Sequence, residues 1–419
     1  MLPDSLTRAN LEFSRRYPGD SGSRQPVHTV YGGAHLFRAD LCGKMGAIAE
    51  RTLAEFAPDA ATLALAIGIP NHLADTVYAR VIEKLKREPV EDFRIDFEDG
   101  YGNRSDAEED ATADSAAEEV LKGLAEGSLP PFLGLRIKCF SEELKERSVR
   151  TLTRFLAAVG SRVPEHFVVT LPKITVPEQV SALIEVLEKL GSLVKMEMMV
   201  ETPQSIFLLP KLVEAARGRC VAAHFGIYDY TASLGITAAH QHMLHPACDF
   251  ARSMMQASLA GTGLWISDGA TNIMPVAPHR GATLSHREIL ENRMVVHRAW
   301  KLHHDHIRHS LDNAFYQGWD LHPAQLPTRY ATVYSFFLEG LDAASERLRN
   351  FISKAAQATI VGDVFDDAAT GQGLLNYFLR AINCGAIPEE EAPKLTGLTL
   401  EELRSASFVK ILNGRRAST

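Results

Sequence analysis

The stretch FRIDFEDGY, residues 93–101, decides the fold, because it alternates apolar with charged side chains and then ends in adjacent carboxylates. Side chains of an extended strand point alternately to its two faces. One face of this stretch is apolar and the other is charged: Phe93, Ile95 and Phe97 against Arg94, Asp96 and Glu98. A barrel strand with an apolar face under the helices and a charged face in the lumen explains this alternation.

Two further stretches, LGLRIK (133–138) and KMEMMVE (195–201), separate apolar and charged side chains in the same way. Runs of strand character recur along the chain at 28–34, 93–99, 132–138, 166–173, 195–201, 220–227, 264–270 and 318–325. Helical patterning lies between most of them, as at 106–127 and 178–191, which are too long for hairpin connections. Antiparallel strands with one solvent-exposed face would also carry apolar residues on one face and charged residues on the other, but the long helical segments weigh against them. The sequence therefore predicts an α/β fold, a (β/α)8 TIM barrel.

The composition fits a globular protein built around one large domain. The chain has 419 residues, of which 46% are hydrophobic and 23% are charged, and its formal net charge is -8. We expect the barrel over 28–330, after an irregular N-terminal arm at 1–27 and before a helical C-terminal extension at 331–419. The acidic balance gives no electrostatic reason to expect nucleic acid or a membrane surface as a partner.

The five cysteines are scattered without close pairs, which argues against a disulfide framework and against a zinc ribbon. The N-terminus lacks the apolar core of a signal peptide, and no apolar run approaches the roughly 18 residues of a membrane span. We therefore expect a cytoplasmic protein.

Polar side chains gather where the predicted strands end, which is where (β/α)8 barrels carry their working groups. They are Glu98, Asp99, Arg136, Lys173, Glu201, Asp229, Asp268, Asn272, His322 and Gln325. Glu201 and Asp229 could hold Mg²⁺, or Mn²⁺, while leaving coordination positions for water and substrate oxygens. A 2-oxo acid would chelate this metal, which would stabilise the enolate formed when the adjacent carbon–carbon bond breaks. Arg136 would add charge-assisted hydrogen bonds, although luminal Glu and Arg residues can also simply pair with one another.

The same residues resemble, in order along the chain, the motifs of a known superfamily. The segments are IDFEDGY (95–101), LRIK (135–138), LPK (171–173), MMVET (198–202), GIYDYTASLG (226–235), ISDGA (266–270) and WDLHPAQL (319–326). They are similar to segments of the HpcH/HpaI aldolase and citrate lyase beta subunit superfamily, which belongs to the phosphoenolpyruvate/pyruvate-binding barrels. The most similar branch opens with QPVHTVY (25–31) and carries DFEDGYG (96–102), and no substrate follows from it.

The resemblance implies roles for residues at the strand ends. It implies Glu201 and Asp229 as magnesium ligands and Arg136 as the group that binds the 2-oxo acid or its enolate. Glu98 and Asp99 would form a catalytic polar cluster that orients metal waters. The remaining implied residues are Lys173 as a luminal ion-pair partner, and Gly32, Gly33, Asp268 and His322 as substrate-binding residues. The resemblance also implies a homo-oligomer, in which the helical extension covers a barrel mouth.

The chain departs from the superfamily's pattern at two places. Tyr228 precedes Asp229 where better-known members have Glu, and Asp366 and Asp367 are shifted from the position of a C-terminal acid/base residue. A phosphate-cradling glycine loop of the P-loop type is also missing, so a CoA-thioester reaction loses support. We therefore expect a magnesium-dependent carbon–carbon lyase of the aldolase type, acting on a 2-oxo acid such as pyruvate or oxaloacetate.

Other interpretations stay open. An acyl-CoA lyase similar to the citrate lyase beta subunit or to malyl-CoA lyases would take an acyl thioester instead. Lys173 or Lys138 could form a Schiff base with a carbonyl substrate, or the barrel could be a non-catalytic binding protein. Histidines at 239–245 and 303–309 could be zinc ligands, but helix-surface histidines with local partners explain them better, because no H-E-x-x-H pattern or cysteine pair accompanies them.

Overall fold

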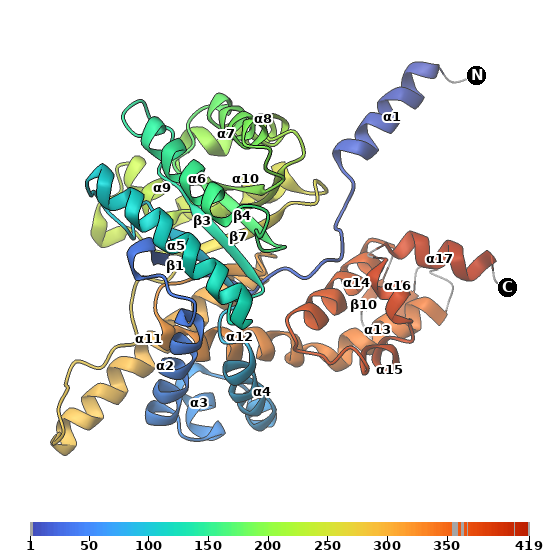
Figure 1. Ribbon diagram of the computed structural model, residues 1–419. Helices are drawn as coiled ribbons and strands as arrows, with labels where there is room; N and C mark the ends of the chain where they lie inside the picture. The colour runs from blue at the N-terminus through green and yellow to red at the C-terminus, as the bar shows by residue number, and fades with distance from the viewer. Residues whose placement is uncertain (1–2, 354–358, 362–363, 367, 406, 418–419) are drawn as a thin grey trace.

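The computed structural model of the chain describes residues 3–353, 359–361, 364–366, 368–405 and 407–417. Its centre is a closed barrel of eight parallel strands, in which each strand pairs with the next and β8 pairs with β1 (Figure 1). The strands are β1 (His28–Gly33), β2 (Asp92–Asp96), β3 (Phe132–Arg136), β4 (Phe167–Leu171), β5 (Lys195–Val200), β6 (Cys220–Phe225), β7 (Trp265–Ala270) and β8 (Gln317–Asp320). All eight predicted strand runs are present, so the (β/α)8 prediction is confirmed.

Helices follow the strands along the chain and cover the outside of the barrel. They are α2 (Leu41–Phe56), α3 (Ala60–Ile67), α4 (Ala74–Arg87), α5 (Asp106–Glu126), α6 (Lys145–Val159), α7 (Pro177–Lys189), α8 (Pro203–Ala215), α9 (Ile227–Ser233), α10 (Pro246–Leu259), α11 (His286–Asp312) and α12 (Leu326–Glu339). The connection from β1 to β2 holds three of them, α2, α3 and α4. One end of the 27-residue α11 projects from the body (Figure 1).

Side chains alternate along the strands as predicted. Phe93 and Ile95 of β2 are at most 1% exposed and belong to the core between the barrel and the helices. The charged face of β2 and β3 points into the lumen, where Asp96 pairs with Arg136 in the register of the two strands. This register places an acid beside a base at the carboxyl ends of both strands.

A network of paired charges fills the middle of the lumen. Arg94 donates to Asp92 and, from Nη2, to Glu197 Oε2 at 2.6 Å. Thr170 donates to Glu197 at 2.8 Å, and His224 Nε2 lies 2.9 Å from the same carboxylate. Burial would raise the pKa of Glu197, but Arg94 and His224 hold it well below its usual range. These contacts join side chains of β2, β4, β5 and β6 across the lumen.

The N-terminal arm contains a helix that was not predicted. Residues 4–16, expected to be irregular, form α1 (Asp4–Arg16), which buries no residue and extends away from the body (Figure 1). An acidic residue in its first turn and two arginines in its last turn favour this helix through the helix dipole. The following segment is fixed to the barrel by Gln25, which bonds to Gln317 at 3.1 Å and accepts from Arg380 at 2.7 Å.

The C-terminal part is mainly helical, as predicted. It contains α13 (Leu341–Ser353), α14 (Ala368–Asn383), α15 (Ala392–Thr396), α16 (Leu400–Arg404) and α17 (Phe408–Ala417), together with an unpredicted antiparallel pair, β9 (Thr359–Val361) and β10 (Val364–Asp366). The expected boundary at residue 330 falls inside α12, whose residues 326–335 are all buried. Arg329 bonds to Asp320 at 2.9 Å, so α12 is anchored to the barrel.

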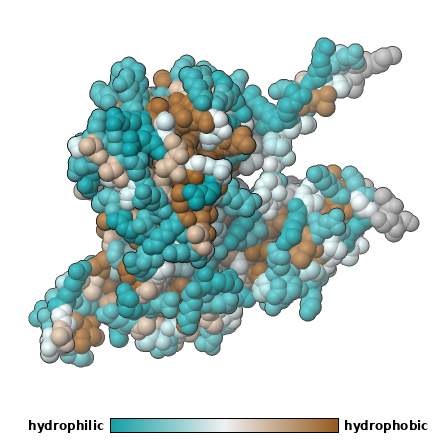
Figure 2. Space-filling model, viewed as in Figure 1, coloured by the Kyte–Doolittle hydropathy of each residue, from teal (hydrophilic) through white to brown (hydrophobic). Residues whose placement is uncertain are grey.

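The face of the molecule seen in Figure 2 is mainly hydrophilic, with hydrophobic residues interspersed over the barrel. Within the described ranges, no helix is both long and apolar enough to cross a membrane.

Candidate active site

The turn that follows β2 carries two of the predicted catalytic carboxylates. Asp96, the last residue of β2, accepts hydrogen bonds from the backbone N–H groups of Glu98 at 2.9 Å and Gly100 at 2.7 Å. The N–H of Tyr101 donates to the Glu98 carbonyl at 3.1 Å and closes the turn. Glu98 and Asp99 are thereby fixed at the carboxyl ends of the strands, where barrel enzymes carry their chemistry.

Arg136, the last residue of β3, lies beside this turn. Its Nε and Nη2 donate to the two oxygens of Asp96 at 2.7 and 2.5 Å, and its Nη1 lies 3.3 Å from both Glu98 and Asp99. Its guanidinium carbon is 4.9 Å from the centre of the Tyr31 ring. Burial would lower the pKa of Arg136, but Asp96 raises it, so the side chain is a fixed cation. Asp96 occupies one edge of the guanidinium, and Nη1 faces the other carboxylates.

Lys173 lies at the centre of the predicted carboxylates. It follows β4 with a φ of 51°, which is uncommon for a residue other than glycine. Its Nζ is 2.5 Å from Glu98, 3.1 Å from Asp99 and 3.5 Å from Asp229, and its backbone N–H donates to Glu201 Oε1 at 2.7 Å. One residue thus joins side chains that follow β2, β5 and β6. We call this group the mouth cluster: Asp96, Glu98, Asp99, Arg136, Lys173, Glu201 and Asp229.

Glu201 follows β5 and is 1% exposed. Gly226, between β6 and α9, packs directly against it, since a Cβ at this position would stand 2.5 Å from Glu201 Cβ and would also collide with Oε2. Glu201 Oε1 accepts the Lys173 N–H, while Oε2 accepts no hydrogen bond from the described part of the chain. Asp229 lies in the first turn of α9, and its side chain is 41% exposed. The site therefore offers one buried and one accessible carboxylate.

The mouth cluster holds five carboxylates and only two cations. Burial, reinforced by Asp229, raises the pKa of Glu201 to about 8 against the opposing charge of Lys173. Burial also raises the pKa of Glu98 to about 7, although Arg136 opposes the shift. Burial would lower the pKa of Lys173, but Glu201 and Glu98 raise it above its usual value. The cluster thus has more carboxyl groups than cations, and burial makes Glu98 and Glu201 hold a proton more readily than ordinary glutamates.

A hard divalent cation fits this donor set. Among the residues that the structure describes, no three His, Cys, Asp or Glu side chains form a group that could hold a metal by themselves. Mg²⁺ commonly takes one or two carboxylates and completes its octahedron with waters and substrate oxygens. Glu201 and Asp229 supply such oxygens beside uncompensated charge, and the metal would share Asp229 with Lys173.

Two predicted substrate-binding residues have other partners. Asp268 on β7 is fully buried and accepts hydrogen bonds from Arg252 at 2.8 Å and from Ser310 at 2.6 Å, which come from the surrounding helices α10 and α11. His322 caps the short helix after β8 by accepting from the Ala324 N–H at 3.1 Å. The structure does not bring either residue into contact with the mouth cluster within the described ranges, so neither placement favours substrate binding.

The two predicted glycines differ in position. A Cβ at Gly32 would stand 2.6 Å from the Phe93 ring, so this residue packs in the barrel wall. A Cβ at Gly33 would collide with the carbonyl of Gly100 and stand 2.7 Å from His35 Cε1. Gly33 therefore permits the close approach of the turn after β2 and is the glycine of the pair that lies at the mouth.

Residues that depart from the superfamily's pattern do not add a carboxylate here. Tyr228 donates from its hydroxyl to the Ala270 carbonyl at 2.8 Å, and burial raises the pKa of that hydroxyl to a value outside the physiological range. Asp367 lies outside the described residues, and only the backbone of Asp366 is described, in β10.

The histidine segment 303–309 is less exposed than predicted. His303 and His306 are buried, and both bond to the Thr271 hydroxyl at 2.9 Å. In the other segment, His245 caps α10 by accepting from the Ala247 N–H at 3.1 Å. Local partners thus account for these imidazoles.

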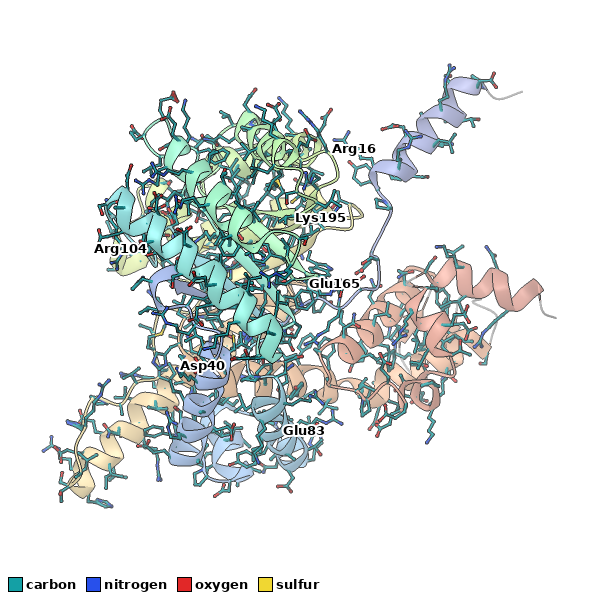
Figure 3. The ribbon with its side chains drawn as sticks, in the orientation of Figure 1. Arg16, Asp40, Glu83, Arg104, Glu165 and Lys195 are labelled. Atoms are coloured by element: carbon teal, nitrogen blue, oxygen red, sulfur yellow. The ribbon has the colours of Figure 1, made fainter. Side chains whose placement is uncertain are left out.

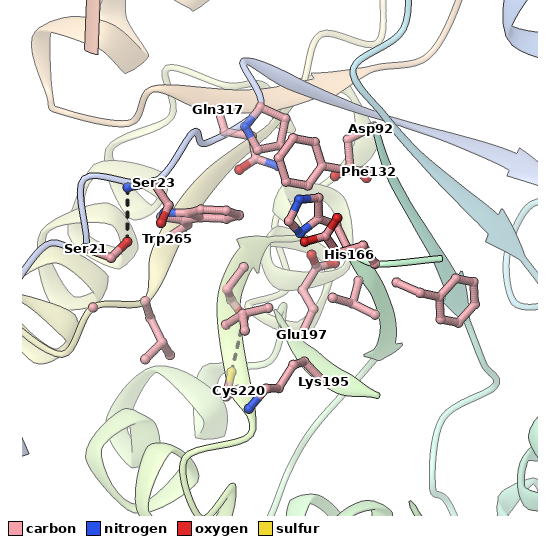
Figure 4. A pocket seen from close by; sticks show the side chains of 18 of the residues that line it. Ser21, Ser23, Asp92, Phe132, His166, Lys195, Glu197, Cys220, Trp265 and Gln317 are labelled. Atoms are coloured by element: carbon pink, nitrogen blue, oxygen red, sulfur yellow. Dashed lines mark hydrogen bonds between the residues drawn. The ribbon is translucent and has the colours of Figure 1, made fainter. Parts of the chain in front are cut away.

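A cavity of 340 Å³ opens at the opposite end of the barrel (Figure 4). The starts of the strands and the N-terminal arm line it, including Ser21, Ser23, Phe132, Lys195, Cys220, Trp265 and Gln317. Glu165 and Lys195 mark this end of the molecule in Figure 3, and Arg104 marks the other. The charges at its inner wall, Arg94 and Glu197, are already paired with each other. We therefore place the candidate chemistry at the mouth cluster, which lies at the end where barrel enzymes carry it.

Sequence reasoning missed the way in which Asp96 and Tyr31 orient Arg136. The alternation of β2 assigned Asp96 to the lumen but gave it no partner. The signal that pairs it with Arg136 is the register between β2 and β3, and register depends on the three-dimensional barrel.

The barrel is shared with solved structures of the citrate lyase type. A citrate lyase from Burkholderia xenovorans LB400 is 18% identical, with a TM-score of 0.58, and the match covers 89% of this chain and 97% of that chain. The protein CitE from Mycobacterium tuberculosis, solved with magnesium, acetoacetate and coenzyme A, is 15% identical, with a TM-score of 0.51 and coverage of 86% and 99%. At these identities the likeness establishes the fold. A search of the curated proteins finds no match. The family model described as Domain of unknown function (DUF6986) matches residues 6–411, and the chain belongs to that family.

Proposed function

We propose that the protein is a magnesium-dependent carbon–carbon lyase of the aldolase type that acts on a 2-oxo acid such as pyruvate or oxaloacetate. The observation that carries this proposal is the surplus of carboxylates in the mouth cluster beside the buried cation Arg136. The similar solved structures support it, since one is a citrate lyase and the other was solved with magnesium.

Two residues of the mouth cluster would hold the cation, and a third would hold the substrate. Glu201 and Asp229 would hold Mg²⁺, which when bound supplies Lewis-acid stabilisation of the negative charge that develops on the keto oxygen. Arg136 would exchange the hydrogen bond from Nη1 to Asp99, 3.3 Å, for one to the substrate carboxylate, while Asp96 holds the opposite edge of the guanidinium. The bonds to Asp96 preorganise this donor before the substrate arrives.

Glu98 is the proton carrier in this proposal. Its raised pKa, about 7, lets it exchange a proton near neutral pH. In cleavage, Glu98 accepts the hydroxyl proton of the fragment that leaves as a carbonyl compound. The carbon–carbon bond breaks, and its electron pair is delocalised onto the 2-oxo fragment as an enolate. Lys173, 2.5 Å from Glu98, stabilises the ionised carboxylate between turnovers.

The test is calorimetric titration of Mg²⁺ and Mn²⁺ into chelator-treated protein, with and without pyruvate or oxaloacetate. We expect the 2-oxo acid to strengthen metal binding, and Glu201→Ala and Asp229→Ala to abolish it. Glu165→Ala, which removes an exposed carboxylate at the opposite end of the barrel, is the matched control and should bind normally. Absence of metal binding in the parent protein would overturn the proposal in favour of Schiff-base chemistry at Lys173 or a non-catalytic barrel.

A parallel titration with acetyl-CoA distinguishes the substrate classes. If the thioester strengthens metal binding and the 2-oxo acids do not, an acyl-CoA lyase replaces the function proposed here.

A further inference from the structure

The cavity at the starts of the strands is lined by aromatic rings. The ring centre of Phe132, the first residue of β3, lies 4.9 Å from that of His166 in a stacked arrangement. The ring centre of Trp265, the first residue of β7, lies 5.9 Å from that of Phe132, edge to face. Strands β3 and β7 are four strands apart in a barrel of eight, so Phe132 and Trp265 meet across the end of the barrel. We call the 340 Å³ cavity that these rings line the basal cavity.

Strand register brings the lining residues together. Leu133 of β3 pairs with Phe167 of β4, so the residues that precede them, Phe132 and His166, are neighbours at the strand starts. Lys195, the first residue of β5, pairs with β4 and lines the same cavity. The wall of the basal cavity is therefore positioned by the backbone pairing of the barrel.

The polar groups of the inner wall already have partners within the chain. Arg94 donates to Asp92 and to Glu197. Cys220 Sγ donates to the Ala222 carbonyl at 3.3 Å, and burial raises the pKa of this thiol to about 12. A protonated thiol is a poor nucleophile, so a molecule in the basal cavity would be bound there and not attacked.

Two charged side chains of the basal cavity have no partner of their own. Glu165 and Lys195 both line the cavity, and both are exposed. Neither side chain forms an ion pair or a hydrogen bond with the residues that the structure describes. In Figure 4 the rings lie together on one side of the pocket, and Lys195 lies on the other. The cavity thus offers an aromatic wall, one negative group and one positive group.

We propose that the basal cavity binds a small zwitterion with an aromatic ring, the chemical class of the aromatic α-amino acids. The ring of the ligand would pack against the rings of the wall, because aromatic pairs attract one another in stacked and edge-to-face arrangements. Its carboxylate would face Lys195, and its ammonium group would face Glu165. The volume of 340 Å³ lies at the small end of the range of about 300–1,000 Å³ for small-molecule sites, which suits one ring with a short chain.

The pair of opposite charges favours a zwitterion over a simple ion. A ligand that carried only a carboxylate would be attracted by Lys195 and repelled by Glu165. A ligand that carried only an ammonium group would meet the reverse situation. A molecule with both groups satisfies both side chains, and its ring accounts for the aromatic wall.

The first test is calorimetric binding of L-phenylalanine to the full chain, beside three analogues that each lack one feature. 3-Phenylpropanoate lacks the ammonium group, 2-phenylethylamine lacks the carboxylate, and cyclohexylalanine lacks the aromatic ring. We expect L-phenylalanine to bind more tightly than all three, by about fivefold for either charge, which is the upper end for an exposed ion pair. Equal affinity of L-phenylalanine and the three analogues would overturn the proposal.

Substitutions assign each contact. Lys195→Gln should weaken L-phenylalanine binding about fivefold and change 2-phenylethylamine binding less than twofold, because the amine lacks the group that Lys195 binds. Glu165→Gln should weaken 2-phenylethylamine and L-phenylalanine and spare 3-phenylpropanoate. Both side chains are exposed, so these variants keep the packed interior. Lys211→Gln is the matched control, since Lys211 is an exposed lysine on α8 outside the cavity.

The aromatic wall and the distance from the mouth cluster give the last two readouts. Trp265→Leu should weaken L-phenylalanine at least fivefold and cyclohexylalanine less strongly. Glu201→Ala should lose Mg²⁺ binding yet keep L-phenylalanine binding, so the basal cavity and the proposed lyase function are tested separately. Absence of L-phenylalanine binding in the parent protein, or unchanged binding in Lys195→Gln and Trp265→Leu, would overturn the proposal and leave the metal site to its own test.

Discussion

Gly226→Ala is a sharp probe of the mouth cluster, because it adds one methyl group and removes no charged group. Residue 226 has a φ of -91°, which alanine adopts freely, so the backbone conformation does not require glycine. The added Cβ would stand 2.5 Å from Glu201 Cβ, whereas carbon atoms in contact prefer separations of about 3.5 Å or more. Glu201 must therefore retreat by about 1 Å, or the end of β6 must move by that amount.

Two effects follow from this displacement. Overpacking of a rigid interior typically lowers the free energy of unfolding by about 1–3 kcal/mol. A carboxylate that has moved by about 1 Å also leaves the position from which it can share a cation with Asp229. We expect Mg²⁺ binding in the presence of pyruvate to weaken at least tenfold, a loss of about 1.4 kcal/mol.

Denaturant unfolding and calorimetry measure the two effects on one preparation. Gly43→Ala in α2 is the matched control, because a Cβ there meets nothing within 4 Å. An alanine in this first turn of α2 should leave stability unchanged or raise it by at most about 0.5–1 kcal/mol, with normal metal binding. If Gly226→Ala kept both the stability and the Mg²⁺ affinity of the parent, the placement of Glu201 against Gly226 would be refuted.

Other predictions concern charged groups in and around the barrel. Burial would raise the pKa of Asp320, but Arg329 holds it well below its usual range. The ionised carboxylate therefore stabilises the fold above about pH 4, and this stabilisation is lost as the pH falls through the pKa of the folded state. Asp320→Asn should cost about 3–5 kcal/mol at pH 7 in denaturant unfolding, and its deficit relative to the parent should shrink toward pH 3. Asp268→Asn should lower the melting temperature, because it leaves Arg252 buried beside a neutral amide. The Mg²⁺ affinity of the folded protein should change less than twofold. Lost affinity with normal stability would instead restore a substrate-binding role for Asp268. Borohydride with pyruvate should leave no adduct on Lys173 by mass spectrometry, since the surrounding carboxylates keep its amine protonated, and a trapped adduct would establish the Schiff-base route.

The barrel could be predicted from sequence because β2, β3 and β5 alternate apolar with charged residues, and the long helical segments between the strands weigh against an antiparallel sheet. Phe93 and Ile95 must be buried under helices, and Arg94 must find partners in the lumen. Helix α1 was missed because the arm as a whole was expected to be irregular; its apolar side chains Leu6, Leu11 and Phe13 remain exposed in the structure.

The candidate site was predicted in its residue types but not in its pairings. Glu201 and Asp268 both lie at strand ends, so their positions in the sequence assigned both of them to the candidate site. The register of β7 with β8 is irregular between Ser267 and Ala270, so side-chain direction at Asp268 cannot be read by simple alternation. Arg252, which pairs with Asp268, lies on α10, which follows β6, and no local sequence motif predicts that contact.

Two buried glutamates, Glu197 on β5 and Glu201 directly after it, show how partners distinguish the middle of the lumen from its mouth. Glu197 and Glu201 are four residues apart and equally buried, yet the pKa of Glu197 is held low by Arg94 and His224 whereas that of Glu201 is raised to about 8. Burial acts on both, so the difference comes from their partners. A carboxylate left without enough positive charge destabilises the folded chain, and such a cost persists where function requires it. Because a cation that binds only the folded state removes this cost, we expect a metal at the mouth of the lumen rather than in its middle, where Arg94 already pairs with Asp92 and Glu197.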